Sequence, residues 1–318
     1  MDHATVVASG TKIAEEIGTT RSEVWRLIQL LRAAGVDVAG RPATGYQLRA
    51  VPDLLLPEML APSLKGTIFG AVRQFHHYYK TGSTNFEAMQ AAAQNAPQGS
   101  VFLAEEQLAG RGRGAHTWHS ERSTGIYCSV ILRPQLPPSE ALIISLAAAL
   151  AVRAAVAEIA PQLLADLKWP NDLLLGGRKF CGILTEMTSE ATRVRYLVVG
   201  IGINVNQLRF PAALSEIATS LRIETRAEWS RVELCTALLK SLDQEYRNLV
   251  EDSHARSAIL RRFEAASSSV RGRQVSIAED GGLAGVTEGL DERGFLRLRT
   301  REGLRTVVSG TVRNISSV

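Results

Sequence analysis

Apolar residues in the first fifty positions recur at helical spacing, in the stretch SGTKIAEEIGTTRSEVWRLIQLLRAAG. A short helix containing Ala14 is predicted to end at Gly18. Thr20 and Glu23 then form a capping box, which predicts the start of a second helix that ends at Gly35. The apolar side chains of this second helix share one face: Val24, Leu27, Ile28 and Leu31. Two helices joined by so short a turn predict a helix-turn-helix.

The residues after this pair alternate as strands do. In VDVAGRPATGYQL, Val36 and Val38 face Tyr46 and Leu48 across a Gly/Pro loop, which predicts a hairpin wing. Candidate DNA contacts lie on the polar side of the second helix: Arg21, Ser22, Trp25, Arg26 and Gln29. Residues 1–50 carry six Lys/Arg against five Asp/Glu, so attraction to phosphates is weak, and a solvated helix face is an equally simple interpretation.

Strand-like and helix-like runs are mixed from about residue 67 to residue 266. The strand-like runs are SVFLAEEQ, GIYCSVILRP, KFCGILTEM and RYLVVGIGINV. Helices are predicted over residues 86–95, 140–159 and 231–249, the last with Ser230 and Glu233 as a capping box. Most strands follow one another too closely for strict βαβ alternation, so the pattern predicts a mixed α/β domain of the α+β class.

Short runs separated by turns fill the last fifty residues. After ASSSV at 266–270, the runs QVSIA, LAGVTEGL, FLRLRT and LRTVVSG are separated by EDGG, DERG and REG. This spacing predicts a small antiparallel barrel. We therefore expect three domains: a winged helix-turn-helix at 1–60, a central mixed α/β domain at 61–267 and a small SH3-like β-barrel at 268–318.

The composition excludes several classes of protein. The chain has 318 residues, with 36 Lys+Arg against 32 Asp+Glu, which is too balanced for a polybasic nucleic-acid binder. Cys128, Cys181 and Cys235 are widely spaced without a CxxC pair, so neither a disulfide framework nor a zinc site is indicated. The N-terminus lacks a signal-peptide pattern, and the apolar run at 141–157 is alanine-rich and interrupted by Arg153. We expect a cytoplasmic protein without a membrane span.

The glycine-rich stretch GRGRGA at 110–115 matches the G-x-G-x-x-G/A string of dinucleotide-binding turns. The following HTWHSERSTG is a poor helix start, GIGINV at 200–205 lacks the third small residue, and no P-loop string occurs. Arg111 and Arg113 instead offer two guanidinium groups suited to carboxylate or phosphate oxygens. Trp118 could stack on a base or cover an apolar ligand, and a solvent-exposed loop remains the alternative if the motif stands alone.

Further motifs accompany the glycine-rich stretch. They are GSTN at 82–85, KWPND at 168–172 and GGRKFCGIL at 176–184, in which Gly176 and Gly177 turn a hairpin that carries Lys179. With Q-x-AGRGR at 107–113, GIGIN at 200–204, the helix-turn-helix and the C-terminal barrel, the set closely resembles the bacterial biotin protein ligases that double as biotin operon repressors. The resemblance covers almost the whole chain.

The resemblance implies a two-step reaction. Biotin's carboxylate attacks the α-phosphate of ATP, with Mg²⁺ brought by the nucleotide, to give biotinyl-AMP, which a carrier-protein lysine then attacks. The resemblance implies Lys179 and Arg113 as catalytic residues. The implied biotin-binding residues are Ser83, Thr84, Asn85, Gln107, Gly110, Arg111, Gly112, Arg113, Lys179 and Gly182. Those implied for ATP or the adenylate are Arg111, Arg113, Trp118, Asn171, Asp172, Lys179 and Asn204.

The implied partners are the biotin carboxyl carrier protein of acetyl-CoA carboxylase, operator DNA and a second copy of the chain. Two departures from the family bear on adenylate retention and on operator binding. Gly114, Ala115 and His116 stand where the family commonly continues with Arg and Gly, and only MDHATVVA precedes Ser9, too few residues for the helix that precedes the family's motif. The short N-terminus leaves open a ligase with a vestigial DNA-binding module. A lipoate or octanoate ligase, which shares the related catalytic fold, is a further alternative.

Overall fold

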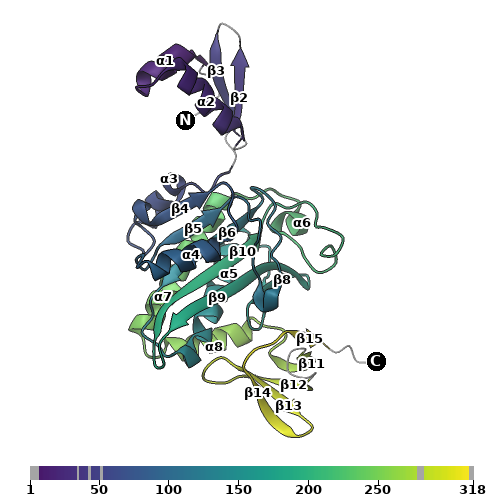
Figure 1. The fold of residues 1–318 in the computed structure, drawn as a ribbon. Coiled ribbons are helices and arrows are strands. Elements are labelled where there is room, and N and C mark those ends of the chain that lie inside the picture. Colours follow the sequence, from purple (N-terminus) through teal and green to yellow (C-terminus); the bar gives the residue numbers. More distant parts are fainter. Residues whose placement is uncertain (1–6, 34–35, 42–43, 51–52, 278–282, 315–318) are drawn as a thin grey trace. The chain divides into compact units, whose positions relative to one another are not determined.

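The structure is a computed structural model that describes residues 7–33, 36–41, 44–50, 53–277 and 283–314. The chain divides into two compact units, residues 1–54 and 55–318. The larger unit contains two sheets, one for the central domain and one for the C-terminal domain (Figure 1).

The N-terminal unit is a helix-turn-helix with a three-stranded sheet. Its elements are β1 (Val7–Ala8), α1 (Gly10–Glu16), α2 (Arg21–Ala33), β2 (Asp37–Arg41) and β3 (Gly45–Ala50), and the sheet order is β1-β3-β2. The predicted wing is confirmed, since Val38 pairs with Leu48. A small core of Ala14, Val24, Ile28, Val36 and Val38 joins the helices to the wing. β1 was not predicted, and the predicted helix end at Gly35 lies outside the described residues.

Two details of α2 differ from the prediction. Thr20 Oγ1 accepts a hydrogen bond from Glu23 N at 3.2 Å, but the Glu23 carboxylate bonds to Arg26, so only half of the capping box forms. Leu31 was placed in the apolar stripe, yet it is 40% exposed, because the small core of this unit covers only Val24 and Ile28 of that stripe.

A seven-stranded sheet forms the centre of the larger unit. The strands are β4 (Phe75–Tyr78), β5 (Val101–Ala104), β6 (Gly125–Leu132), β7 (Asp166–Lys168), β8 (Asp172–Leu175), β9 (Arg178–Ser189) and β10 (Val194–Asn204). Their order is β4-β5-β6-β10-β9-β8-β7, and only β4 and β5 pair in parallel. The α+β class is confirmed.

Helices cover both faces of this sheet (Figure 1). α4 (Thr84–Ala93) lies on one face, and α5 (Leu142–Ile159), α7 (Arg231–Glu251) and α8 (Ala255–Ala265) lie on the other, with short helices α3 (Pro57–Leu60) and α6 (Leu221–Thr225) outside these layers. Neighbouring strand residues alternate between the faces: Phe102 packs in the α4 cluster, whereas Leu103 packs in the large core on the other face. α5 is long and apolar enough to cross a membrane, but two-thirds of that stretch is buried in this core.

The C-terminal domain is an antiparallel sheet that packs against the central domain. Its strands are β11 (Arg271–Ile277), β12 (Leu283–Leu290), β13 (Leu296–Thr300), β14 (Gly303–Val307) and β15 (Val312–Asn314), in the order β14-β13-β12-β11-β15. The predicted β-rich domain is confirmed, whereas its closure as a barrel is not: among the described strands, the edge strands β14 and β15 do not pair. The turn between β12 and β13 reaches the central domain, where the buried Trp169 indole donates to the Gly294 carbonyl at 2.9 Å.

Candidate active site

A pocket lies on the α4 face of the central sheet, and glycines form its floor. Along β10, the residues facing α4 change from bulky side chains to Gly200 and Gly202, and Gly202 pairs with Gly182 of β9. A Cβ on Gly200 would lie 2.0 Å from Asn85 Oδ1, and one on Gly202 would lie 2.5 Å from the Trp118 indole. Only glycine allows this close approach, so Asn85 and Trp118 lie directly against the stretch of sheet that forms the pocket floor.

The pocket brings together most of the predicted site residues. The predicted residues in its lining are Ser83, Thr84, Asn85, Gln107, Arg111, Gly112, Arg113, Trp118, Asn171, Lys179 and Gly182. Its lining also includes residues that the sequence analysis did not single out: Tyr127, Cys128, Ile183, Leu184, Gly200, Ile201 and Gly202. The glycines could have been found, because GIGIN was recognised as a motif and glycine inside an apolar strand marks a close approach.

One wall of the pocket is polar and internally hydrogen-bonded. At the start of α4, Thr84 N and Thr84 Oγ1 both donate to Gln107 Oε1, at 2.8 and 3.2 Å. The Gln107 amide nitrogen donates to Ser120 at 3.1 Å, and the buried Ser129 hydroxyl lies 2.6 Å from Asn85 Oδ1. These bonds fix the amide orientations before any ligand binds. The Ser83 hydroxyl, by contrast, has no hydrogen-bond partner among the described residues.

A second wall is the segment 107–122, which we call the Arg/Gly loop. It folds back as a small hairpin in which Gly112 N donates to His116 O at 2.7 Å and Trp118 N donates to Gly110 O at 2.8 Å. Gly114 forms the turn with φ +61°, and no α-helix follows, so a dinucleotide-binding turn is absent here. His116 closes the hairpin through its backbone, and its side chain is exposed.

Three positive side chains converge on the pocket. Lys179 lies on the predicted β8–β9 hairpin, whose turn glycines have φ +54° and +80°, and its Nζ is 2.7 Å from Asp172 and 5.5 Å from the Trp118 ring centroid. Arg113 donates to Asn171 Oδ1 at 3.3 Å, and Arg111 lies 3.5 Å from Glu186. The arrangement suits an anionic ligand whose charge sits above an apolar, glycine-floored slot.

Family comparisons agree with this geometry. The models for an HTH domain, the biotin/lipoate A/B protein ligase family and the biotin protein ligase C terminal domain match residues 3–47, 79–204 and 270–313. The bifunctional ligase/repressor BirA of Bacillus subtilis is 35% identical over 306 residues, covering 96% of this chain and 93% of that protein. The chain belongs to the biotin protein ligase family.

Two further relatives of the ligase extend the match. The biotin--[acetyl-CoA-carboxylase] ligase of Mycobacterium tuberculosis is 34% identical over 265 residues, which cover 80% of this ligase and 95% of that one. The structure of the Aquifex aeolicus biotin protein ligase in complex with biotin and ATP aligns with a TM-score of 0.65 at 29% identity, over 76% of this ligase and 99% of that chain. The protein is thus a biotin protein ligase with an N-terminal HTH domain.

Three predicted residues of the ligase do not line the pocket. Asn204 is buried and donates to Thr219 O at 3.0 Å, so it holds the segment after β10 in place. Gly110 lies behind the pocket, where a Cβ would come within 2.6 Å of the Trp118 carbonyl oxygen. Asp172 touches the pocket only through its ion pair with Lys179.

The cysteines of the ligase are buried. Burial raises the pKa of the Cys181 thiol, although it lies two residues from Lys179, so the thiol stays protonated and serves as a small core side chain. In the described part of the chain, no three His, Cys, Asp or Glu side chains come together as a metal site.

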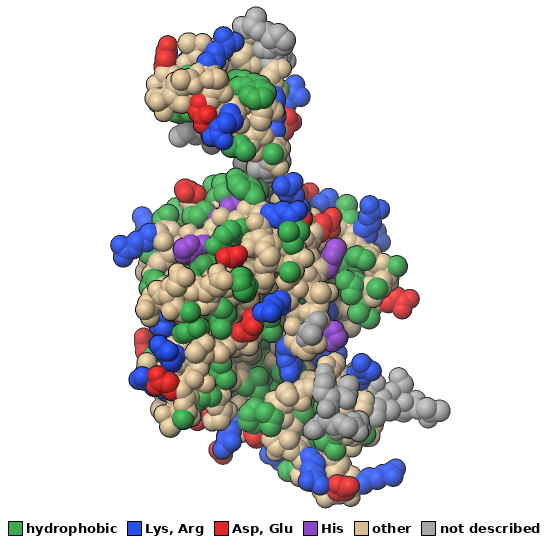
Figure 2. Space-filling model, viewed as in Figure 1, with side chains coloured by type: hydrophobic (Ala, Val, Ile, Leu, Met, Phe, Trp, Pro, Cys, Tyr) green, Lys and Arg blue, Asp and Glu red, His purple; other side chains and the backbone are tan. Residues whose placement is uncertain are grey.

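The predicted DNA contacts belong to the separate N-terminal unit. Arg21, Ser22, Trp25 and Arg26 are exposed, and Gln29 is half-buried. Arg26 forms a two-pronged ion pair with Glu23, at 2.6 and 2.9 Å, which offsets its charge. Figure 2 shows positive and negative side chains interspersed on the visible face of this unit. Any attraction to DNA would therefore depend on a few side chains of α2 rather than on a broad positive surface.

Proposed function

We propose that the protein is an ATP-dependent biotin–[biotin carboxyl carrier protein] ligase. Biotin would be activated to biotinyl-5′-AMP and then transferred to a lysine of the carrier protein of acetyl-CoA carboxylase. One observation carries the proposal: the cations Lys179, Arg111 and Arg113 line the same glycine-floored pocket as the fixed amides of Asn85 and Gln107. Such a pocket suits a neutral, hydrogen-bonding ring system that ends in a carboxylate.

The polar wall supports a biotin site at the start of α4. The Ser83 hydroxyl can hydrogen-bond the ligand, and Thr84, Asn85 and Gln107 surround the same position. Gly112 and Gly182 let the ligand approach the backbone closely. Gly110 contributes indirectly, because it lets the two arms of the loop's hairpin lie close together: a Cβ there would come within 2.6 Å of the Trp118 carbonyl oxygen.

The positive side chains support the chemistry of the first step. A biotin carboxylate oxygen attacks the α-phosphorus, a new O–P bond forms, and pyrophosphate leaves with the electrons of the broken P–O bond. Negative charge grows on the α-phosphate oxygens, so Lys179 and Arg113 are the proposed catalytic cations. Trp118 would cover the adenylate, with Arg111 and Asn171 at its edge. In the second step, the carrier lysine attacks the acyl carbon, a C–N bond forms, AMP leaves with the electrons of the broken C–O bond, and the amine nitrogen loses a proton.

Asp172 and Asn204 have supporting roles in this proposal. Asp172 would orient Lys179, and Asn204 would hold the strand end beneath the nucleotide. Magnesium bound to the phosphates of ATP would neutralise part of their charge. Asn171 and Asp172 carry the oxygen donors that Mg²⁺ prefers, and we expect them to be the residues of this chain nearest to it.

Pyrophosphate exchange into ATP tests the substrate. We expect exchange with biotin and none with lipoate or octanoate. Exchange with lipoate alone would instead assign the chain to the lipoate branch. Transfer is tested with a purified carrier domain, which should gain one biotin per acceptor lysine when the complete enzyme, ATP and Mg²⁺ are present.

We also propose that the N-terminal unit binds operator DNA, through Arg21, Ser22, Trp25, Arg26 and Gln29 of α2. The exposed indole and guanidinium groups of this helix support contact with base edges and phosphates. A gel shift on the DNA upstream of the organism's biotin genes, with and without biotin and ATP, tests this. No shift would leave a ligase with a vestigial DNA-binding module.

A homodimer and a cytoplasmic location complete the proposal. The homodimer is an expectation from the family resemblance, and the cytoplasmic location is an expectation from the sequence pattern. Sedimentation of the full chain with and without biotin and ATP tests the first, and fractionation of cells tests the second.

A further inference from the structure

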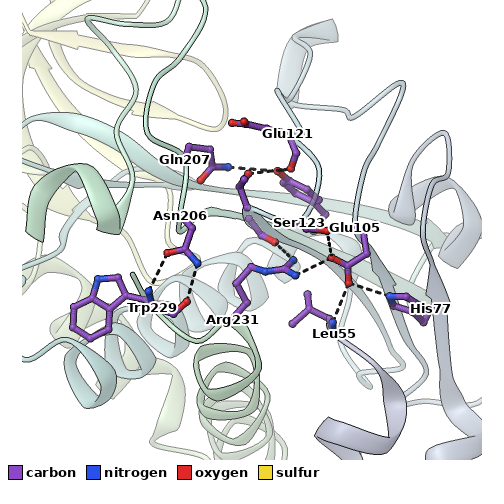
Figure 3. Close-up of polar contacts among 12 residues, drawn as sticks. Leu55, His77, Glu105, Glu121, Ser123, Asn206, Gln207, Trp229 and Arg231 are labelled. Carbon is purple, nitrogen blue, oxygen red and sulfur yellow. Dashed lines mark hydrogen bonds and ion pairs between the residues drawn. The ribbon is translucent and has the colours of Figure 1, made fainter. Parts of the chain in front are cut away.

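A buried carboxylate stands at the base of the Arg/Gly loop. Glu105 directly follows β5, two residues before Gln107, and its side chain is 1% exposed. Figure 3 shows its two oxygens facing different neighbours. Oε1 lies 2.9 Å from Leu55 N and 3.0 Å from His77 Nε2, and Oε2 lies 3.0 Å from Ser123 Oγ and 2.9 Å from Arg231 Nη2.

These contacts join the two ends of the Arg/Gly loop. The loop leaves the sheet at Glu105 and returns at Gly125, the first residue of β6. On the returning side, Ser123 N donates to Glu105 O at 2.9 Å, and Ser123 Oγ donates to the carboxylate. The guanidinium of Arg231 spans both sides, because Nη1 donates to Gly125 O at 3.0 Å while Nη2 bonds to Glu105.

Arg231 is itself held firmly. It is the first residue of α7, which Ser230 caps by accepting a hydrogen bond from Glu233 N at 3.2 Å. The preceding Trp229 exchanges two backbone hydrogen bonds with the Asn206 side chain, at 2.8 and 3.0 Å (Figure 3). The base of the loop is therefore connected to a long helix and to the segment that follows β10.

The carboxylate is ionised at neutral pH. Burial acts to raise the pKa of Glu105, but the hydrogen bond from His77 and the charge of Arg231 outweigh it and lower the pKa to about 2. None of Glu105, Arg231, Ser123 and His77 lines the pocket, so no ligand there would contact them. Their arrangement cannot be explained as part of the binding surface.

We propose that Glu105 and Arg231 are positioning residues for ligation: the contacts of the Glu105 carboxylate with Ser123 and Arg231 fix both ends of the Arg/Gly loop and so set how long the loop retains the adenylate. The proposal rests on the proposed biotin ligation, because the adenylate is the ligand that the loop would retain. A loop whose ends are fixed loses less conformational freedom when it closes over a ligand, so the closed state is longer-lived.

Two variants and a matched control test this proposal. Ser123→Ala removes one hydrogen bond at the returning end and leaves the ion pair intact, and Glu105→Gln removes the negative charge facing Arg231. The control is Glu245→Gln, because Glu245 forms a two-pronged ion pair with Arg262 of α8, at 2.6 and 2.7 Å, and also lies on α7 but away from the loop. All three changes are made in the full chain.

The measurements are the release rate of biotinyl-AMP from the enzyme and hydrogen exchange of residues 107–122. We expect Ser123→Ala to release the adenylate about tenfold faster, as for loss of one hydrogen bond to a charged group, and Glu105→Gln to release it faster still. Hydrogen exchange of the loop should rise in both variants. Glu245→Gln should lower the melting temperature while release stays within twofold of wild type.

Wild-type release and loop exchange in folded Ser123→Ala would overturn the proposal, and so would equal acceleration by Glu245→Gln. Ser123→Ala still tests the proposal if Glu105→Gln does not fold. Wild-type enzyme that forms no adenylate from biotin and ATP would refute the proposed function instead. In that case the exchange of residues 107–122 still reports whether the ion pair holds the loop.

Discussion

Two ion pairs flank the same loop but differ in exposure. The side chains of Lys179 and Asp172 are 34% and 22% exposed at the pocket, whereas those of Arg231 and Glu105 are 0% and 1% exposed behind it. Water screens the first pair, so a ligand can compete for Lys179 at small energetic cost. The second pair is removed from water, so its charges interact with each other and with neighbouring buried groups and stabilise the fold. Exposure thus separates a charge that is available for catalysis from one that holds structure.

The largest effect should come from the exposed pair. Lys179→Ala should lower the adenylation rate by roughly 10²- to 10³-fold, because one stabiliser of the growing phosphate charge is lost. Single-turnover formation of biotinyl-AMP measures this. Lys80→Ala is the matched control, since Lys80 pairs with Glu106 at 3.1 Å beside the same loop but does not line the pocket. Rates within threefold of wild type for Lys179→Ala would remove Lys179 from the mechanism.

A substitution in the buried pair should lower the stability of the protein. Glu105→Gln should lower the free energy of unfolding by about 3 kcal/mol, because a buried guanidinium then faces a neutral amide. Asp172→Asn should change it by less than about 1 kcal/mol, since its pair with Lys179 is partly solvated. Urea unfolding of both variants measures the difference. Equal losses of unfolding free energy would show that the two ion pairs do not differ in their contribution to stability.

A substitution in the glycine floor should have a smaller effect, on the affinity for biotin. Gly202→Ala places a Cβ 2.5 Å from the Trp118 indole, so the ring must move and biotin should bind about tenfold to thirtyfold more weakly. Gly82→Ala is the control, because its Cβ would meet no atom within 4 Å. Equilibrium titration with biotin measures both, and equal affinities would show that Trp118 is not fixed by the floor.

Arg113→Gly should speed adenylate escape by about tenfold, since one guanidinium no longer holds the phosphate. His116→Ala should leave the half-life of the bound adenylate within threefold, because the His116 side chain is exposed and makes no hydrogen bond among the described residues. A chase with unlabelled biotin and ATP measures both. Slower escape from Arg113→Gly would contradict the assignment.

The smallest expected effect is on the pH dependence of stability. The pKa of Glu105 is lowered in the folded protein, so its stabilising effect is present above the unfolded value near 4.5 and is lost as the pH falls toward about 2. Wild type should therefore lose stability over this range more steeply than Glu105→Gln. Urea midpoints between pH 5 and pH 3 test this, and parallel slopes would count against it.

Motifs predicted the residues that line the pocket better than the residues that support them. KWPND and the Arg/Gly loop were recognisable because their residue types and order are unusual. Gly200 acts by leaving room for Asn85, since a Cβ on Gly200 would lie 2.0 Å from Asn85 Oδ1, and this need appears only when β10 and α4 are packed together. Glu105 and Arg231 are 126 residues apart in the sequence, and neither belongs to a motif.

The same limit applies to the fold. Periodicity predicted the hairpin wing and the α5 and α7 helices, because each has a local pattern that packing confirms. The exposure of Leu31 and the open order of the C-terminal sheet depend on how much surface a neighbouring element covers. Tertiary contacts, rather than local propensity, decide such features.

The hydrogen bond between the Trp169 indole and the Gly294 carbonyl bears on the modularity of the protein. A chain ended at the predicted boundary near residue 268 would lose this hydrogen bond, at a cost of about 0.5–1.5 kcal/mol. It would also uncover Leu146, which lies 2.8 Å from the position of a Cβ on Gly294. The C-terminal sheet therefore stabilises the segment KWPND through its β12–β13 turn. A hybrid ligase with an exchanged C-terminal sheet should fold only when this turn and the tryptophan that bonds to it come from the same protein.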